Sequence, residues 1–271
     1  MTVLEPAPDL TIDRRQSVVR AQFNRPNQKN ALNAAIIDGL FDLCASLRED
    51  RQARALVLRG AGGTFCAGGD VKDFGRQLMT PDPEPGAVDP LIAINRRFGD
   101  LLLELDALPQ VVVSVVEGAA FAGGLGFVAV SDIAIAASDA RFSISEATLG
   151  LVPAQIAPFL VRKIGLFNAR RLALTGLRFD GAAARDFGLV SDCVAPGEVD
   201  EALAAVLGDV LRCEPEAVAA TKAILRRAAP IDPAILDDAA SAFARGLRKA
   251  GRVGAAAFAS KAPPPWVEKP D

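Results

Sequence analysis

The sequence predicts an α/β fold in which strands and helices alternate, followed by an α-helical C-terminal region. Short apolar runs typical of buried strands are separated by segments whose apolar residues recur at helical spacing. Two of these strands end in glycine-rich turns that lead into a helix, and the alternation stops near residue 197. We therefore expect a strand-and-helix core at residues 1–197 and a helical region at residues 198–271, both within one structural unit.

The composition indicates a globular chain with a sizeable core. Of its 271 residues, 51% are hydrophobic and 23% are charged, which suits one large domain or a domain with an appendage. The net charge of −3 argues against a nucleic-acid-binding protein. No apolar run is as long as a membrane span, and the N-terminal residues carry no signal-peptide pattern. We therefore expect a cytoplasmic protein that does not associate with membranes.

Histidine and tyrosine are absent, which limits the chemistry that the chain can perform. The absence excludes Ser-His-Asp triads, histidine general bases and zinc sites that use histidine. The four cysteines lack metal-ligand spacing. Acid–base chemistry must therefore use Asp, Glu, Lys, Cys or backbone groups.

The first third of the chain contains strands, helices and one proline-rich loop. Strands are predicted at Leu10–Arg15, 17–24 and 53–59, and helices are predicted from the Asn33 cap to Leu47 and at 91–105. Residues 1–9 are expected to be a loose leader. Residues 81–90 hold four prolines, and we expect them to form a mobile loop.

The chain is organised around residues 117–146. A buried strand at Val111–Val116 leads into a glycine-rich turn at 118–126, a short helical segment at 127–130 and a second buried strand at Ile133–Ala137. A strand, a glycine-rich turn and a helix start place N–H groups at the positive end of a helix dipole, and such groups stabilise an oxyanion. The stretch ends at Glu146, a single carboxylate in an apolar sequence.

The rest of the chain is expected to be mostly helical. Helices are predicted at 156–164, at 169–175, from the Asp180 cap to Phe187, and at 198–212, 215–228 and 233–250. A short strand is predicted at 189–194. The tail at 261–266 holds three prolines, and we expect it to be extended.

The small-residue turns at 67–70 and 122–124 are candidate oxyanion-binding elements. If they converge, one N–H from each is placed to hold a single carbonyl oxygen. Their small side chains allow an acyl group to approach the backbone. The alternative is that each turn only connects a strand to a helix.

Glu146 is the candidate acid–base residue, because apolar surroundings raise the pKa of a carboxyl group. The alternative is an ion-paired or helix-terminal carboxylate. Asp70 is expected to cap the helix behind the first turn, and Cys66 is expected to be a packed thiol because it lacks a base partner. Lys29 and Lys261 are expected to be solvated, with contact to a phosphate as the alternative.

Three segments together resemble the crotonase superfamily, the enoyl-CoA hydratase/isomerase family. They are FCAGGDVKDF at 65–74, VEGAAFAGG at 116–124 and the SDIAIAA strand. The resemblance runs from RPNQKNALN at 25–33 to GAAAFASKAPPPW near the C-terminus, and so covers nearly the whole chain. It implies a spiral of ββα units with a helical C-terminal region that builds trimers, usually paired into hexamers.

The resemblance also implies roles for individual residues. The backbone N–H groups of Ala67 and Gly123 correspond to the oxyanion hole for a thioester carbonyl, and Glu146 corresponds to a catalytic glutamate. Coenzyme A arrives as part of the acyl-CoA substrate, so no separate cofactor is implied. The residues that match its binding site are Lys29, Ala31, Ala67, Gly69, Asp70, Val71 and, at the 3′-phosphate, Lys261.

One position departs from the short-chain hydratases of this family, which use two glutamates. The first of these glutamates falls on Gly126. The segment 145–181 resembles hydratases of branched glutaconyl thioesters, namely 3-methylglutaconyl-CoA hydratases and the isohexenylglutaconyl-CoA hydratase of acyclic terpene breakdown. We hypothesise that Gly126 removes a carboxylate that would repel the distal carboxylate of such a substrate, and that it leaves room for a branch.

The resemblance therefore implies an enzyme that adds water to an α,β-unsaturated CoA thioester with a single glutamate. The nearest alternative is a Δ3-Δ2 enoyl-CoA isomerase, which needs the same oxyanion hole and one carboxylate. A thioester hydrolase is a further alternative. A fourth possibility is a non-catalytic acyl-CoA-binding trimer that kept the fold and lost the chemistry.

Overall fold

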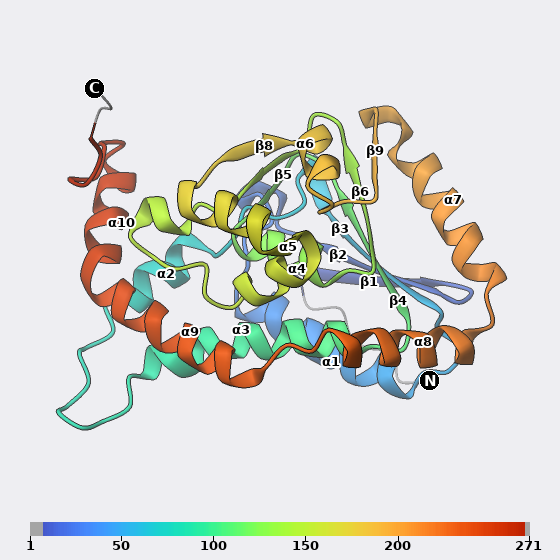
Figure 1. The fold of residues 1–271 in the computed structure, drawn as a ribbon, viewed down its shortest axis with the longest axis horizontal. Coiled ribbons are helices and arrows are strands. Elements are labelled where there is room, and N and C mark those ends of the chain that lie inside the picture. The colour runs from blue at the N-terminus through green and yellow to red at the C-terminus, as the bar shows by residue number, and fades with distance from the viewer. Residues whose placement is uncertain (1–7, 269–271) are drawn as a thin grey trace.

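The computed structural model describes residues 8–268, and a six-stranded sheet forms its centre. The strand order is β1 (Leu10–Arg15), β2 (Val18–Phe23), β3 (Ala55–Gly60), β4 (Val111–Val116), β6 (Ile133–Ala137) and β9 (Asp192–Val194). β1 and β2 form an antiparallel hairpin, and every later pair is parallel. Figure 1 shows helices packed around this sheet. The α/β prediction is confirmed. Residues 1–7, most of the expected leader, lie outside the described part.

A second sheet of three short strands was not predicted from the sequence. It consists of β5 (Ala119–Phe121), β7 (Arg141–Ser143) and β8 (Arg178–Asp180). β5 and β7 pair in parallel, whereas β7 and β8 are antiparallel. Each strand has three residues, which is too short to display the alternating pattern that identifies a strand in a sequence. The sheet matters for position, because β5 leads to Gly123 and β7 leads to Glu146.

The helices of the core lie between its strands in the chain. They are α1 (Ala34–Glu49), α2 (Val71–Leu78), α3 (Pro90–Ala107), α4 (Gly123–Val130), α5 (Ala157–Thr175) and α6 (Gly181–Asp186). The side chains of Asn33, Asp70 and Asp180 each accept a hydrogen bond from an N–H in the first turn of their helix. These caps confirm the three expected helix starts.

Two helix boundaries differ from the prediction. α4 begins at Gly123 rather than near residue 127, because its first turn is built from the glycine-rich segment itself. α5 spans both of the helices expected at 156–164 and 169–175, with non-helical Gly165 (φ 74°) between them. Glycine adopts this positive φ without steric cost, so the chain bends there and the helix resumes.

The C-terminal region is helical, as predicted. It contains α7 (Val199–Arg212), α8 (Pro215–Ala228), α9 (Pro233–Gly246), a π-helical turn (Leu247–Gly251) and α10 (Arg252–Ala259). α9 lies along α3 (Figure 1), and α10 packs on the segment Glu146–Leu149. A Cβ built on Gly254 would lie 2.2 Å from the Leu149 carbonyl oxygen, so glycine is required there. The expected extended tail instead contains a turn, in which the Val267 N–H donates to the Pro264 carbonyl at 3.0 Å.

The proline-rich loop between α2 and α3 is tied to the π-helical turn by Arg248. The Arg248 guanidinium makes two hydrogen bonds to the carboxylate of Asp89, one to Asp82 at 2.7 Å and one to the Thr80 carbonyl at 3.2 Å. These hydrogen bonds hold the pKa of Asp89 below its ordinary value. The sequence predicted a mobile loop, but the structure shows that both ends of this loop are anchored.

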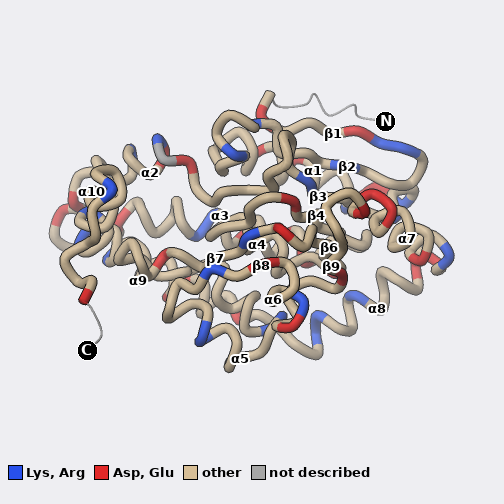
Figure 2. Tube along the Cα trace, turned by 90° about the horizontal axis from the view of Figure 1, so that it is seen from above, with Lys and Arg blue, Asp and Glu red and all other residues tan. Residues whose placement is uncertain are grey.

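No helix within residues 8–268 has both the length and the apolar character needed to cross a membrane. Figure 2 shows basic and acidic residues interspersed along the chain rather than gathered on separate faces. The expected absence of nucleic-acid binding and the cytoplasmic location remain predictions.

A cluster of phenylalanines joins the hairpin, α3 and α4 inside the core. Phe127 on α4 is fully buried, and its ring centroid lies 5.3 Å from that of Phe23 and 5.6 Å from that of Phe98. Phe65 extends the cluster, with its centroid 5.5 Å from that of Phe23. Aromatic pairs at these distances add to the stabilisation from buried area alone. The cluster therefore fixes α4, and with it the glycine-rich turn, against the large sheet.

We expect Phe127→Ala to lower the free energy of unfolding by about 3–5 kcal/mol, because it leaves a cavity at the centre of this cluster. Chemical denaturation followed by circular dichroism measures the loss. Val88→Ala is the control, since Val88 is 80% exposed and its truncation is expected to change stability by less than about 0.5 kcal/mol. Equal midpoints for Phe127→Ala and the wild type would contradict the role of the cluster.

Candidate active site

The two glycine-containing turns converge. The Phe121 N–H donates to the Cys66 carbonyl at 3.0 Å, and the Cys66 N–H donates to the Ala119 carbonyl at 2.9 Å. A Cβ built on Gly68 would lie 3.1 Å from the Cβ of Ala122, and Gly68 has φ 97°, so glycine is needed both for the turn and for the close approach. The convergence expected from the sequence is therefore confirmed.

One edge of the first turn is closed by the 25–33 loop. The Ala67 N–H donates to the Lys29 carbonyl at 3.0 Å, the Leu32 N–H to the Gly68 carbonyl at 2.8 Å, and the Asp70 N–H to the Leu32 carbonyl at 2.9 Å. The Ala67 N–H is thus already engaged and is not free for an oxyanion. The family resemblance implied that the Ala67 N–H is a donor of the oxyanion hole, and this hydrogen bond argues against that assignment.

Two N–H groups of the first turn, those of Gly68 and Gly69, have no acceptor in the described part of the chain, and Gly69 is the candidate donor. A peptide unit is planar and trans, so the Gly69 N–H points opposite to the Gly68 carbonyl of the same unit. Because that carbonyl faces Leu32, the N–H faces the other edge, where the second turn lies. In the described part of the chain it has no hydrogen-bond acceptor, and a Cβ built on Gly69 would meet nothing within 4 Å.

The donor of the second turn is Gly123, the first residue of α4. The Ala122 carbonyl accepts from the Leu125 and Gly126 N–H groups, so the Gly123 N–H of the same peptide unit points out of the helix start. It has no acceptor among the described residues. Ala122 adopts φ 47° and ψ −119°, a conformation that residues with a side chain rarely take. This strained backbone is held by the hydrogen bond from the Ala122 N–H to the Ser143 carbonyl at 3.1 Å.

Glu146 lies at the same end of the small sheet. β5 and β7 are parallel with Phe121 opposite Ser143, so the residues that follow both strands emerge at one edge. The Glu146 Oε2 atom is buried and has no hydrogen-bond partner within residues 8–268. Burial raises the pKa of Glu146 to about 7. An unpaired carboxyl group with this pKa can both accept and return a proton near neutral pH.

Gly126, the position of the missing second carboxylate, lies in an apolar environment. A Cβ built on it would lie 2.7 Å from Cγ2 of Ile156, 3.4 Å from Cδ1 of Leu102 and 3.4 Å from the Phe98 ring. The space that a second carboxylate would need is therefore occupied by apolar side chains. The room for a branch that we hypothesised at Gly126 is therefore filled, mainly by Ile156.

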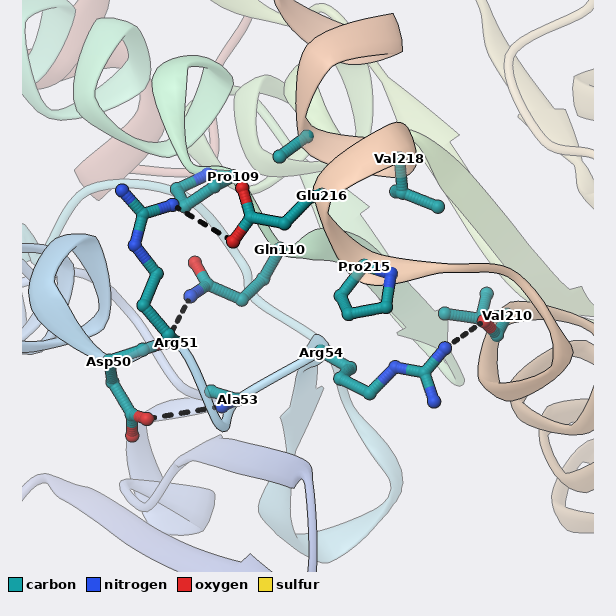
Figure 3. Close-up of a pocket in the computed structure, with 11 residues that line it drawn as sticks. Asp50, Arg51, Ala53, Arg54, Pro109, Gln110, Val210, Pro215, Glu216 and Val218 are labelled. Carbon is teal, nitrogen blue, oxygen red and sulfur yellow. Dashed lines mark hydrogen bonds and ion pairs between the residues drawn. The ribbon is translucent and has the colours of Figure 1, made fainter.

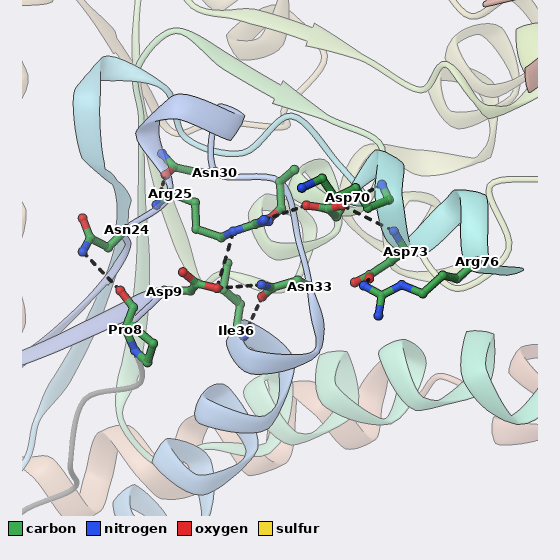
Figure 4. A network of polar contacts seen from close by, with 12 residues as sticks. Pro8, Asp9, Asn24, Arg25, Asn30, Asn33, Ile36, Asp70, Asp73 and Arg76 are labelled. Atoms are coloured by element: carbon green, nitrogen blue, oxygen red, sulfur yellow. Dashed lines mark hydrogen bonds and ion pairs between the residues drawn. The ribbon is translucent and has the colours of Figure 1, made fainter. Parts of the chain in front are cut away.

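Asp70 is committed to structural contacts, as the sequence predicted. Its carboxylate accepts hydrogen bonds from the Lys72 and Asp73 N–H groups and pairs with Arg25 at 2.7 Å. Burial by itself raises the pKa of Asp70, but Arg25 and these N–H donors together hold it below the ordinary value. Figure 4 shows Arg25 between Asp9 and Asp70. No role for Arg25 was predicted from the sequence.

The other residues matched to coenzyme A lie in different environments. Lys29 is exposed on the 25–33 loop, next to buried Ala31, and Val71 is the first residue of α2. Lys261 is exposed just beyond α10. Cys66 is fully buried, and burial raises the pKa of its thiol to about 12, so it is a packed thiol rather than a nucleophile.

An open pocket of about 680 Å³ lies between α2, the start of the proline-rich loop and α10. Its volume is typical of small-molecule sites. Leu78, Met79, Thr80, Pro81, Asp82, Arg252, Ala255, Ala256 and Ala259 line it. A second apolar cluster shares Leu78 with this pocket and extends through Leu91 and Leu247 to Leu149 and Leu151 beside Glu146.

A second, much smaller pocket of about 20 Å³ near the start of α8 contains none of the candidate residues (Figure 3). Arg54 donates there to carbonyls at the end of α7, and the Gln110 amide donates to carbonyls at the end of α1. The Gln110 Oε1 atom is buried and has no hydrogen-bond partner among residues 8–268, and the volume of the pocket suits a single water molecule. This pocket is structural. Among residues 8–268, no three Cys, Asp or Glu side chains are grouped as a metal site requires.

Comparison with known proteins agrees with this architecture. The family described as enoyl-CoA hydratase/isomerase matches residues 13–269. AtuE of Pseudomonas aeruginosa is 45% identical, with a TM-score of 0.77 over 96% of this chain and 100% of that one. An enoyl-CoA hydratase/isomerase from Marinobacter aquaeolei is 40% identical, with a TM-score of 0.78 over 96% and 99% of the two chains. The mouse enoyl-CoA hydratase domain-containing protein 2, a mitochondrial protein, is 35% identical over 94% of this chain and 86% of its own. The chain therefore belongs to the enoyl-CoA hydratase/isomerase family.

Proposed function

We propose that this protein adds water to an α,β-unsaturated CoA thioester. The observation that carries the proposal is the buried carboxyl of Glu146, at the end of the small sheet where Gly123 also lies. Its Oε2 atom has no hydrogen-bond partner within residues 8–268, and its pKa is raised to about 7. The N–H groups of Gly69 and Gly123 are the two donors of the oxyanion hole. Gly69 replaces Ala67 in this role, because the Ala67 N–H is bound to the Lys29 carbonyl.

The reaction proceeds by addition of water to the enoyl group. The Glu146 carboxylate takes a proton from water while the water oxygen bonds to the β-carbon. The electron pair of the C=C bond forms a new double bond between the α-carbon and the carbonyl carbon, and the carbonyl electron pair moves onto the oxygen. The Gly69 and Gly123 N–H groups hold the resulting enolate oxygen. The proton on Glu146, or one from a second water, then reaches the α-carbon and restores the thioester. Each oxyanion donor of this kind contributes about 3 kcal/mol to stabilisation of the transition state.

The acyl chain proposed for this site is a branched glutaconyl group. The environment of Gly126 supports it: Ile156, Leu102 and Phe98 present no negative charge to the distal carboxylate of such a substrate. The original hypothesis was that Gly126 removes a repelling carboxylate and leaves room for a branch. We retain the first part, that Gly126 removes a carboxylate that would repel the distal carboxylate of the substrate. The room for a branch is placed instead in the apolar cluster near Leu149 and Leu151, which continues into the open pocket.

Coenzyme A is proposed to enter along the 25–33 loop, with Lys29, Ala31, Gly69 and Val71 beside its path and Lys261 at the 3′-phosphate. Asp70 is a weaker candidate than the sequence implied, since its carboxylate is already satisfied by Arg25 and the start of α2. We further propose a homotrimer or a hexamer of paired trimers in which residues 198–271 take part, and a cytoplasmic location.

The nearest rival reaction is isomerisation of a Δ3 to a Δ2 enoyl thioester. One carboxylate suffices for it, because Glu146 would move a proton from the α-carbon to the γ-carbon. The observation that favours this rival is that Gly126 stands where the short-chain hydratases of the family carry their first glutamate, which leaves Glu146 as the one matching carboxylate. The mass of the product separates the two reactions, since hydration adds a water and isomerisation does not.

We expect the wild type to turn over 3-methylglutaconyl-CoA or isohexenylglutaconyl-CoA faster than crotonyl-CoA. Glu146→Gln is expected to lower kcat by about 100-fold or more, because the amide cannot act as a base. Loss of the conjugated enoyl-thioester absorbance measures the rate, and Glu216→Gln, on α8, is the control. Intact thioesters in all three assays would refute the hydratase and leave the isomerase or a non-catalytic acyl-CoA-binding trimer.

The pH dependence follows from the raised pKa of Glu146. Only the ionised carboxylate is a base, so kcat/KM should rise with pH through an apparent pKa of about 7. The folded state holds this proton more tightly than the unfolded chain, whose glutamate has a pKa near 4.5, so stability should fall as pH rises between these values. Melting temperatures of the wild type and Glu146→Gln across pH 4–8 test this. A constant difference between them would contradict the raised pKa.

Gly126→Glu and Gly126→Gln form a matched pair that separates charge from size. Both should lower stability by about 1–3 kcal/mol, since any side chain there collides with Ile156. Only the glutamate adds a negative charge, so glutaconyl turnover should be lower in Gly126→Glu than in Gly126→Gln. Crotonyl-CoA, which has no distal carboxylate, is the control substrate. Equal glutaconyl rates in the two variants would rule out the electrostatic role.

A further inference from the structure

We propose that Arg25 is a positioning residue that aligns the Gly69 N–H for the thioester oxygen. The inference rests on the proposed function and assigns a role to a side chain outside the oxyanion hole itself. Arg25 lies two residues beyond the end of β2, and its side chain is 13% exposed. Its backbone N–H donates to the side chain of the buried Asn30 at 2.8 Å, which fixes the start of the 25–33 loop.

The Arg25 guanidinium links two chain segments. It donates to the Ala31 carbonyl on one segment and pairs with the Asp70 carboxylate at 2.7 Å on the other. Leu32 follows Ala31 in the chain, and Gly69 precedes Asp70. Leu32 and Gly69 pair with each other as an isolated parallel β-bridge. The guanidinium therefore spans the pair of segments whose hydrogen bonds orient the Gly69 peptide unit.

The orientation of the Gly69 N–H depends on that pairing. The Leu32 N–H to Gly68 carbonyl bond fixes one end of the peptide plane, and the Asp70 N–H to Leu32 carbonyl bond fixes the residue after Gly69. If the two segments move apart, the Gly68–Gly69 peptide plane can rotate, and the Gly69 N–H no longer points at the thioester oxygen. A displacement of about 1 Å at a reacting group can lower a rate about 100-fold.

Arginine suits this role better than lysine. A planar guanidinium donates in several fixed directions at once, whereas an ammonium group is a point charge on a flexible stem. Arg25 uses these directions on the Ala31 carbonyl, on Asp70 and on Asp9, whose Oδ2 atom is 3.5 Å away. Asp9 in turn accepts from the Asn33 side chain at 2.6 Å, so the clamp continues to the start of α1 (Figure 4).

The test compares Arg25→Lys with Arg162→Lys. Arg162 pairs with Asp106 through two hydrogen bonds between α5 and α3, and its 19% exposure makes it a matched ion pair away from the turns. With the thioester that the wild type hydrates fastest, Arg25→Lys should lower kcat about 10- to 100-fold while KM changes less than about 3-fold. Arg162→Lys should keep kcat within about 2-fold of the wild type.

A spectroscopic readout reports the donor directly. Butyryl-CoA labelled with ¹³C at the thioester carbonyl has no double bond to hydrate, and its bound carbonyl band in the infrared should move to lower wavenumber on the wild type. That shift should shrink on Arg25→Lys and persist on Arg162→Lys. If Arg25→Lys does not fold, Asp70→Asn against Asp106→Asn gives the same comparison from the partner side.

An unchanged kcat and carbonyl band in Arg25→Lys would overturn the inference. Equal losses in Arg25→Lys and Arg162→Lys would also overturn it, because they would indicate a general effect on folding. The proposed function fails separately: in that case the wild type itself turns over no thioester and leaves the carbonyl band unshifted.

Discussion

The hydrogen bond from the Leu32 N–H to the Gly68 carbonyl is the constraint on which the candidate site depends. It fixes a peptide plane, and a fixed plane aims the Gly69 N–H away from Leu32 and toward the turn of Gly123. The parallel pair β5–β7 then brings Glu146 to the same edge. Backbone donors suit a chain without histidine or tyrosine, because their positions are set by the fold rather than by a reactive side chain.

The sequence predicted those features whose cause is local. The caps Asn33, Asp70 and Asp180 bind N–H groups within three residues, and the central strands β4 and β6 are almost wholly apolar runs. The choice between Ala67 and Gly69 was not local, because it depends on which N–H the distant Lys29 carbonyl engages. The anchored loop was missed for the same reason, since Arg248 binds it from the other end of the chain.

Glu146 combines a cost in stability with a gain in reactivity. An ionised carboxylate buried without a partner is unfavourable, and this is why its pKa rises to about 7. A second carboxylate at position 126 would raise that pKa further, because two like charges disfavour ionisation of both. With glycine at position 126, where an added Cβ would meet uncharged Ile156, Leu102 and Phe98, this repulsion is absent. A single glutamate with a pKa near 7 is therefore consistent with the uncharged surroundings of position 126.

Arg25 and Arg248 each tie together segments that are distant in the sequence, and they differ in what they position. Arg25 joins the segments that carry the backbone donor, whereas Arg248 holds the proline-rich loop against the turn that follows α9. A buried ion pair contributes little net stability, because the loss of hydration offsets the attraction between the charges. What such a pair does supply is geometry, since a planar guanidinium satisfies its partners in only a few arrangements. Stabilisation of the fold therefore does not explain the ion pairs of Arg25 and Arg248. Their role is explained by the orientation that they impose on the groups they bind.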